Sequence, residues 1–114
     1  MDNYRNTALS STDVQVQIAS TGGVPVRGFN FINPNSTEVY VKFYDALATN
    51  VTVGTTTPVL TLMVPSNGSV FEAYDRNKIV AFFSTAITIA CVTGLADNDT
   101  TAPSTAIHAS IQYN

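Results

Sequence analysis

Short stretches in which apolar and polar residues alternate recur along the chain, and turn-forming residues separate them. In the first clear stretch, Val14, Val16 and Ile18 occupy alternate positions. A period of two places successive side chains on opposite faces of a strand, so this stretch predicts a half-buried β-strand. The same alternation returns near the end, at residues 107–113. No segment sustains a helical period, and the chain is therefore predicted to be all-β.

Turn signals divide the chain into about eight predicted strands. The predicted strands cover residues 12–18, 24–33, 38–46, 58–64, 70–74, 79–83, 86–93 and 107–113. Short strands at this spacing are typical of an antiparallel β-sandwich or jelly roll. Pro25 and Gly28 indicate an edge position or a bulge in the second strand. Residues 58–64 are apolar enough to predict burial on both faces.

The length and the first residues predict one domain with a short extension. A chain of 114 residues suits a single hydrophobic core. Residues 1–11 are polar and carry no period, so we expect a flexible N-terminal arm there and a single β-sandwich domain over residues 12–114. Tyr4 and Leu9 are the apolar anchors through which such an arm could order against another chain.

The charge composition bears on which partners to expect. Charged residues make up 11% of the chain, against about 25% in an average soluble protein. The five Lys and Arg residues are mostly scattered, whereas nucleic-acid binding needs clustered positive charge, so we expect no nucleic-acid partner. No apolar run approaches the roughly 18 residues of a membrane span, and no signal peptide precedes the first strand. We expect no membrane partner and synthesis in a cytosol-like compartment.

The residues that most often carry chemistry are few. Cys91 follows Ile87 and Ile89 in an apolar strand, which predicts a buried, unreactive core thiol. His108 is the only histidine and alternates with apolar neighbours, so we expect a solvated or interface position. The segment Asp97–Asp99 could supply calcium ligands, but no later carboxylate follows it, which favours a capped turn. We expect no catalytic residue, no metal, no cofactor and no small-molecule substrate.

The tyrosines are the better candidates for a contact surface, because tyrosine is enriched at protein interfaces. Tyr40 and Tyr44 share one face of the third predicted strand, on either side of Lys42. That face is either a second packed layer or an interface, and the sequence favours neither. The candidate interface residues are Tyr4, Leu9, Tyr40, Tyr44 and Tyr74.

Residues 39–113 resemble a group of small proteins encoded among the structural genes of tailed phages. The resemblance lies in five ordered motifs: Val41-Lys42-Phe43-Tyr44-Asp45, Val53-Gly54-Thr55-Thr56-Thr57-Pro58-Val59, Val64-Pro65-Ser66-Asn67-Gly68, Phe83-Ser84-Thr85-Ala86-Ile87-Thr88 and Asp97-Asn98-Asp99-Thr100-Thr101-Ala102-Pro103. Ala86 stands where the group's pattern usually has Gly. Each motif alone is weakly specific, and it is their order that carries the resemblance.

The resemblance implies a β-sandwich protein of the bacteriophage virion without catalytic residues. Our first expectation is a capsid decoration, or cement, protein that lies on the capsid surface, is made in the host cytoplasm, and bridges subunits of the major capsid protein. A homotrimer at local threefold axes is the simplest closed assembly for that role. A tail, neck or fibre-associated virion protein is the alternative. A carbohydrate-binding module using the tyrosine face ranks below both, because the chain has no Trp, and an enzyme ranks last.

Overall fold

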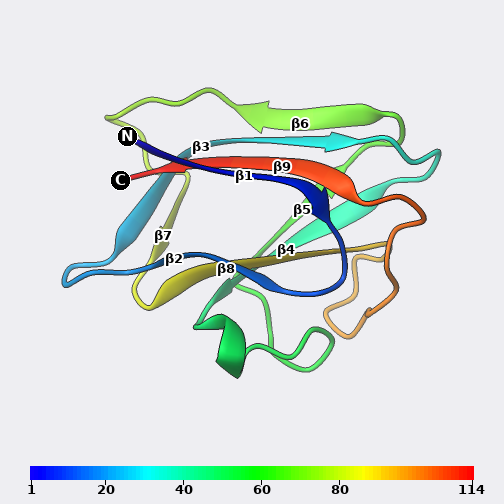
Figure 1. Ribbon diagram of the computed structural model, residues 1–114, viewed down its shortest axis with the longest axis horizontal. Coiled ribbons are helices and arrows are strands. Elements are labelled where there is room, and N and C mark those ends of the chain that lie inside the picture. The colour runs from blue at the N-terminus through cyan, green and yellow to red at the C-terminus, as the bar shows by residue number, and fades with distance from the viewer.

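Two antiparallel sheets pack face to face in a computed structural model that describes residues 1–114 (Figure 1). The prediction of an all-β antiparallel β-sandwich is confirmed, with nine strands and one short 3-10 turn, η1 (Ala48–Asn50). The strands are β1 (Asp2–Leu9), β2 (Val14–Ile18), β3 (Val24–Asn33), β4 (Val39–Asp45), β5 (Leu60–Val64), β6 (Gly68–Glu72), β7 (Ala81–Phe83), β8 (Ala86–Val92) and β9 (Ile107–Tyr113).

The strand order mixes segments that are far apart in the sequence. Sheet A has the order β1-β9-β3-β6, and β7 also pairs with β3. Sheet B has the order β2-β8-β4-β5. The two ends of the chain lie side by side, because Asp2 in β1 pairs with Tyr113 in β9 (Figure 1). Consecutive strands often lie in different sheets, so the fold depends on non-local pairing.

The predicted N-terminal arm is wrong for residues 2–9, which form strand β1. This strand pairs with β9 from Asp2 opposite Tyr113 to Leu9 opposite Ile107. Tyr4 packs against the core, and Leu9 is fully buried in it. The alternation was hidden because a bulge between Asn6 and Leu9 shifts the register and because an edge strand can present polar residues to water.

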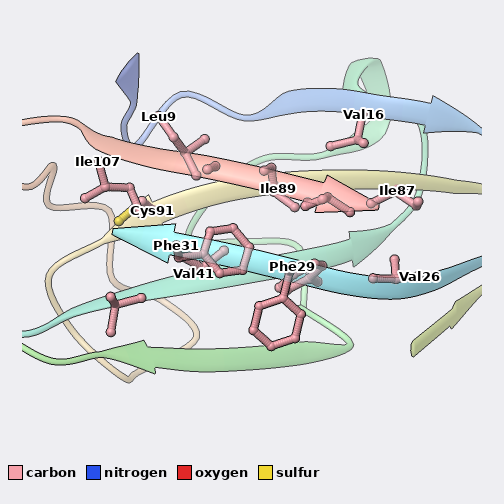
Figure 2. Packing of buried hydrophobic residues seen from close by; sticks show 14 of the residues in the cluster. Leu9, Val16, Val26, Phe29, Phe31, Val41, Ile87, Ile89, Cys91 and Ile107 are labelled. Carbon is pink, nitrogen blue, oxygen red and sulfur yellow. The ribbon is translucent and has the colours of Figure 1, made fainter. Parts of the chain in front are cut away.

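The core lies between the two sheets and joins them through aromatic rings. One cluster of 17 buried residues draws on both sheets. Phe31 in sheet A meets Phe43 in sheet B edge-on, with ring centroids 5.9 Å apart. The Phe29 ring lies 5.3 Å from that of Phe31, and the Phe83 ring lies 6.1 Å from that of Phe43, between centroids. The close-up in Figure 2 shows Phe29, Phe31 and Cys91 within the cluster. Apolar side chains from both sheets therefore fill the interior.

Two details of the strands modify the sequence interpretation. The sequence left open an edge position or a bulge around Gly28, and the bulge is present: the register between β3 and β9 shifts between Val26 and Gly28, while β3 lies between β9 and β6. A side chain on Gly28 would lie 2.9 Å from backbone atoms of Tyr74, so only glycine lets that segment cross so closely. The prediction that residues 58–64 are buried on both faces is wrong: β5 begins at Leu60, forms an edge of sheet B, and is mostly half-buried.

No helix in the chain has the length and apolarity that a membrane crossing requires.

Candidate functional site

The outer face of sheet B is covered by the chain itself over β8 and most of β4. Five outward residues there are almost fully buried, whereas Tyr40 at the start of β4 is half-buried. The five are Lys42, Tyr44, Thr88, Ala90 and Val92. Tyr44 and Ala90 pack with Val51, and the half-buried Ala46 and Val53 complete this small second cluster. The segment after β4 therefore folds back over the sheet. The second-layer interpretation holds for this end of the strand, and Tyr44 is unavailable to another chain.

Lys42 is buried on this face without a carboxylate partner. Its Nζ atom donates hydrogen bonds to the backbone oxygens of Leu95 and Ala96, at 2.6 and 3.0 Å. A buried ammonium group needs such partners, because losing water without replacement is costly. Lys42 therefore ties the loop after β8 to the middle of sheet B.

Asp45 fixes a second loop. Its carboxylate accepts hydrogen bonds from the backbone N–H groups of Ser84, Thr85 and Ala86 and from the Ser84 hydroxyl, at 2.8 to 3.3 Å. Partial burial raises the pKa of Asp45, but these hydrogen bonds outweigh burial and leave the pKa below its ordinary value of 3.8. Asp45, the last residue of the first motif, thus caps the turn at residues 84–86 in the fourth motif.

Two further motifs meet at Gly54 and Thr100. Gly54 has a φ of +90°, and a side chain there would collide with the Thr100 methyl group. Asp99 accepts a hydrogen bond from the backbone N–H of Thr101 at 2.7 Å, which is the capped turn that the sequence favoured. Asp97 is exposed, and no group of three or more His, Cys, Asp or Glu side chains is placed to hold a metal ion.

The motif residues therefore stabilise turns and loops of the fold. Asn67, in the turn of the third motif, has a φ of +48° and donates its backbone N–H to the Asn35 oxygen. Ala86 is buried and lies outside the left-handed region, so its position does not require glycine. What the five motifs share is the tying of loops to sheet B or to each other.

Cys91 lies in the core, as predicted. Its side chain is fully buried, and burial raises the pKa of the thiol to about 12. The thiol therefore remains protonated at neutral pH, and the protonated form is a poor nucleophile.

The outer face of sheet A, in contrast, is open. The strand register arranges its outward residues in three rows across β1, β9, β3 and β6. The rows are Asn3–Gln112–Gly28, Arg5–Ser110–Asn30–Phe71 and His108–Ile32–Ser69. We call these three rows the open face. Most of its side chains are exposed, but Gly28 is buried where the backbone of Glu72 and Tyr74 crosses it. No loop cluster comparable to that on sheet B covers the rest.

The open face is polar but almost uncharged. Its three rows contain two ionisable side chains, Arg5 and His108, and no carboxylate. A shallow hollow of about 220 Å³ spans β1, β9 and β3. The residues that line the hollow are Arg5, Asn6, Thr7, Asn30, Ile32, His108, Ala109 and Ser110. Uncharged amides and hydroxyls are cheaper to desolvate than charges, so this face is suited to contact with another chain.

The predicted interface residues scatter over the molecule. The prediction is wrong for Leu9 and Tyr44, whose side chains are buried in the core and beneath a loop. Tyr4 is half-buried against the core. Tyr40 is half-buried and donates its hydroxyl to Glu38 at 3.3 Å. Tyr74 is exposed beside the open face. For Tyr4, Tyr40 and Tyr74 an interface role stays a prediction.

The sequence did not indicate that Arg5, Asn30 and Phe71 lie on one surface. It placed His108 correctly on the solvent side of β9, where the alternation was clear. Phe71 follows Ser69 by two positions, and that spacing puts both on the same face of a strand. Without the pairing of β6 with β3, the spacing does not say which face looks outward.

Comparison with protein-family models and with curated proteins gives no match. Among solved structures, the chain is similar to one titled "Crystal structure of PirA", with 10% identity and a TM-score of 0.45. The similarity covers 99% of this chain and 92% of that chain.

Proposed function

We propose that the chain is a structural protein of a tailed-phage particle that decorates the outside of the capsid and stabilises it by bridging capsid subunits. The observation that carries the proposal is the contrast between a stiffened sandwich and one large, open, nearly uncharged sheet face. The ordered motifs of residues 39–113 support the virion context by resemblance. The partners would be the major capsid protein and further copies of this chain.

A rigid body suits a bridging role, because a bridge resists separation only if it does not deform itself. Lys42 and Asp45 tie loops to sheet B through six hydrogen bonds. The buried Asn33 and Asn35 hold two further segments, since Asn33 donates to the Val64 and Pro65 backbone oxygens and Asn35 donates to the Thr105 backbone oxygen. These hydrogen bonds hold the connections around sheet B in place.

The open face supports contact with protein. The exposed Asn30 amide offers a hydrogen-bond donor and acceptor, while Ile32 and Phe71 offer exposed apolar surface. Interfaces commonly combine apolar anchors with uncharged polar groups and trapped water. Such a face fits another protein chain better than the phosphate backbone of a nucleic acid, which calls for several clustered cations.

A role in the tail, neck or fibres uses the same physical properties, and the copy number separates the two. The experiment is quantitative mass spectrometry of purified particles of the phage that encodes the chain, scaled to the major capsid protein. A decoration protein is expected at hundreds of copies, in a fixed ratio to the capsid lattice. A few dozen copies or fewer would assign the chain to the tail or neck instead, and its absence from particles would refute the virion role.

A heat challenge adds a functional readout. Particles that lack the protein are expected to release their DNA at a lower temperature than complete particles, and adding the purified protein back should restore the difference. Equal heat resistance with and without the protein would contradict a stabilising role even at high copy number.

A further inference from the structure

We propose that two copies of the chain pair through the open face, around a two-fold axis that runs parallel to the strands between β9 and β3. The inference rests on the proposed function in that it names an occupant for the same face. It can be tested on the purified protein, without a phage particle.

The first observation is that an aromatic side chain is exposed at one edge of the open face. Phe71 on β6 is 65% exposed. It pairs with Asn30 at an outward position of β3, so its ring lies on the outer side of sheet A. An exposed aromatic ring on a sheet face indicates a contact surface, since water is a poor environment for it.

The second observation is that the other side of the face carries the complementary groups. Arg5 on β1 and His108 on β9 lie beside the hollow, on the opposite side of the midline from Phe71. A guanidinium group attracts the face of an aromatic ring. Each copy therefore carries a cation at one edge of the open face and an aromatic ring at the other.

The register determines how two such faces meet. Arg5, Ser110, Asn30 and Phe71 form one row across four neighbouring strands. A two-fold axis along the midline exchanges the two halves of each row. It places Arg5 over Phe71 of the second copy and Ser110 over Asn30 of the second copy. In the next row it places His108 over Ile32 of the second copy. Every contact then occurs twice, as an isologous interface requires.

Charge repulsion favours the axis parallel to the strands over one perpendicular to them. A two-fold axis in the same plane but perpendicular to the strands would place Arg5 against Arg5 and Phe71 against Phe71. Like charges facing each other are unfavourable, whereas the parallel axis gives each Arg5 an aromatic partner. The rows contain no carboxylate that could neutralise a pair of arginines.

The experiment measures the mass of the purified full chain by sedimentation equilibrium over a range of micromolar concentrations. The wild type is expected to reach twice the chain mass of 12.1 kDa. Phe71→Arg should raise the dimer dissociation constant at least about tenfold, because it faces Arg5 of the second copy. Phe71→Glu should still pair, since its carboxylate can form an ion pair with that same Arg5. The double variant Arg5→Glu with Phe71→Arg should pair again.

Leu95→Arg is the matched control, because Leu95 is 64% exposed but lies on a loop over sheet B. It should leave the dimer intact. A wild-type monomer at every concentration, or a trimer, would overturn the pairing. So would equal effects of Phe71→Arg and Leu95→Arg, or a Phe71→Glu variant that dissociates as completely as Phe71→Arg. Circular dichroism of each variant establishes that the β-sandwich is retained.

The outcomes also separate this inference from the proposed function. A chain that pairs as described but is absent from particles removes the virion role and leaves the pairing. A monomeric chain found at hundreds of copies on capsids removes the pairing and leaves the role.

Discussion

The two sheets share one core, yet the outer face of sheet B is largely covered by loops and the outer face of sheet A is largely exposed. On sheet B, Lys42 and Tyr44 occupy outward positions but are each only 1% exposed. On sheet A, Asn30 and His108 occupy equivalent outward positions and are exposed. The alternation along the strands is similar on both sheets, so the pattern alone does not distinguish an exposed outward position from a covered one.

The connections between strands account for the difference. Residues 46–59 follow β4 and residues 93–106 follow β8, and both β4 and β8 belong to sheet B. These long connections fold back over the outer face. There Val51 packs on Tyr44, and the backbone oxygens of Leu95 and Ala96 accept hydrogen bonds from Lys42 Nζ. No connection of that length follows β1 or β3 in sheet A. A long ordered connection buries surface, and here it buries one face only.

The largest expected effect comes from removing an edge of sheet A. Deleting residues 2–10 removes the ladder between β1 and β9 and the buried Leu9 side chain. Losing a core leucine alone costs about 2–5 kcal/mol, a large part of the total stability of a small domain. We therefore expect the truncated chain to lose its cooperative thermal transition in circular dichroism.

A matched variant keeps β1 and changes only outward residues, namely Asn3→Ser together with Arg5→Ser. It should melt close to the wild type. If the truncated chain also melts normally, β1 contributes little to the fold and the flexible arm predicted from the sequence is the better description.

The next effect compares two tyrosines. Tyr44 is 1% exposed under the loop on sheet B, and Tyr74 is 37% exposed beside the open face. Tyr44→Ala should lower the free energy of unfolding by about 3–5 kcal/mol, because a large buried ring is lost and a cavity remains. Tyr74→Ala should change it by about 1 kcal/mol or less. Urea denaturation of both variants measures the two values, and similar losses would show that the loop does not seal sheet B.

A smaller effect is expected at the Asp45 cap. Asp45→Asn weakens the hydrogen bonds to the turn at residues 84–86 and should cost about 1–2 kcal/mol at neutral pH, toward the low end because the carboxylate is partly solvent-screened. The pKa of Asp45 is lowered in the folded state. The ionised cap therefore contributes fully above the pKa of the unfolded chain and is lost as the pH falls through the folded pKa.

Urea denaturation between pH 7 and pH 3 tests this cap. The gap between wild type and Asp45→Asn should be constant down to about pH 5 and then narrow. Asp97→Asn, at an exposed carboxylate on a loop over sheet B, should behave as the wild type does. A gap that widens on acidification would mean that the sign of the assigned shift is wrong.

The smallest effects are expected on the open face itself. Asn30→Ser and Ser110→Ala change outward polar groups that no loop covers. The Ser110 hydroxyl is hydrogen-bonded only to the neighbouring Asn3 and Gln112 side chains, where water can replace it. At concentrations where the chain is monomeric, each should alter the free energy of unfolding by no more than about 0.5 kcal/mol. A loss comparable to that of Asp45→Asn would show that the open face is itself part of the stabilising structure.

The sequence by itself determined the class of fold and most strand positions. Alternation placed Val14–Ile18 and Ile107–Tyr113 correctly, and the apolar context of Cys91 predicted its burial. These features are local, because period two and apolar content are properties of a few neighbouring residues. Local residue types likewise indicated an edge position or a bulge near Gly28, and the pairing of β3 shows the bulge.

Only the tertiary structure decided that residues 2–9 form an edge strand, that Tyr44 is covered, and that Arg5 shares a row with Phe71. Each of these facts depends on which strands are neighbours and where the long connections pass. Pairing between segments as distant as β1 and β9 is set by the energy of the whole sandwich, and no short window of sequence contains it. The residues of the open face are therefore readable in the sequence, but their assembly into one surface is not.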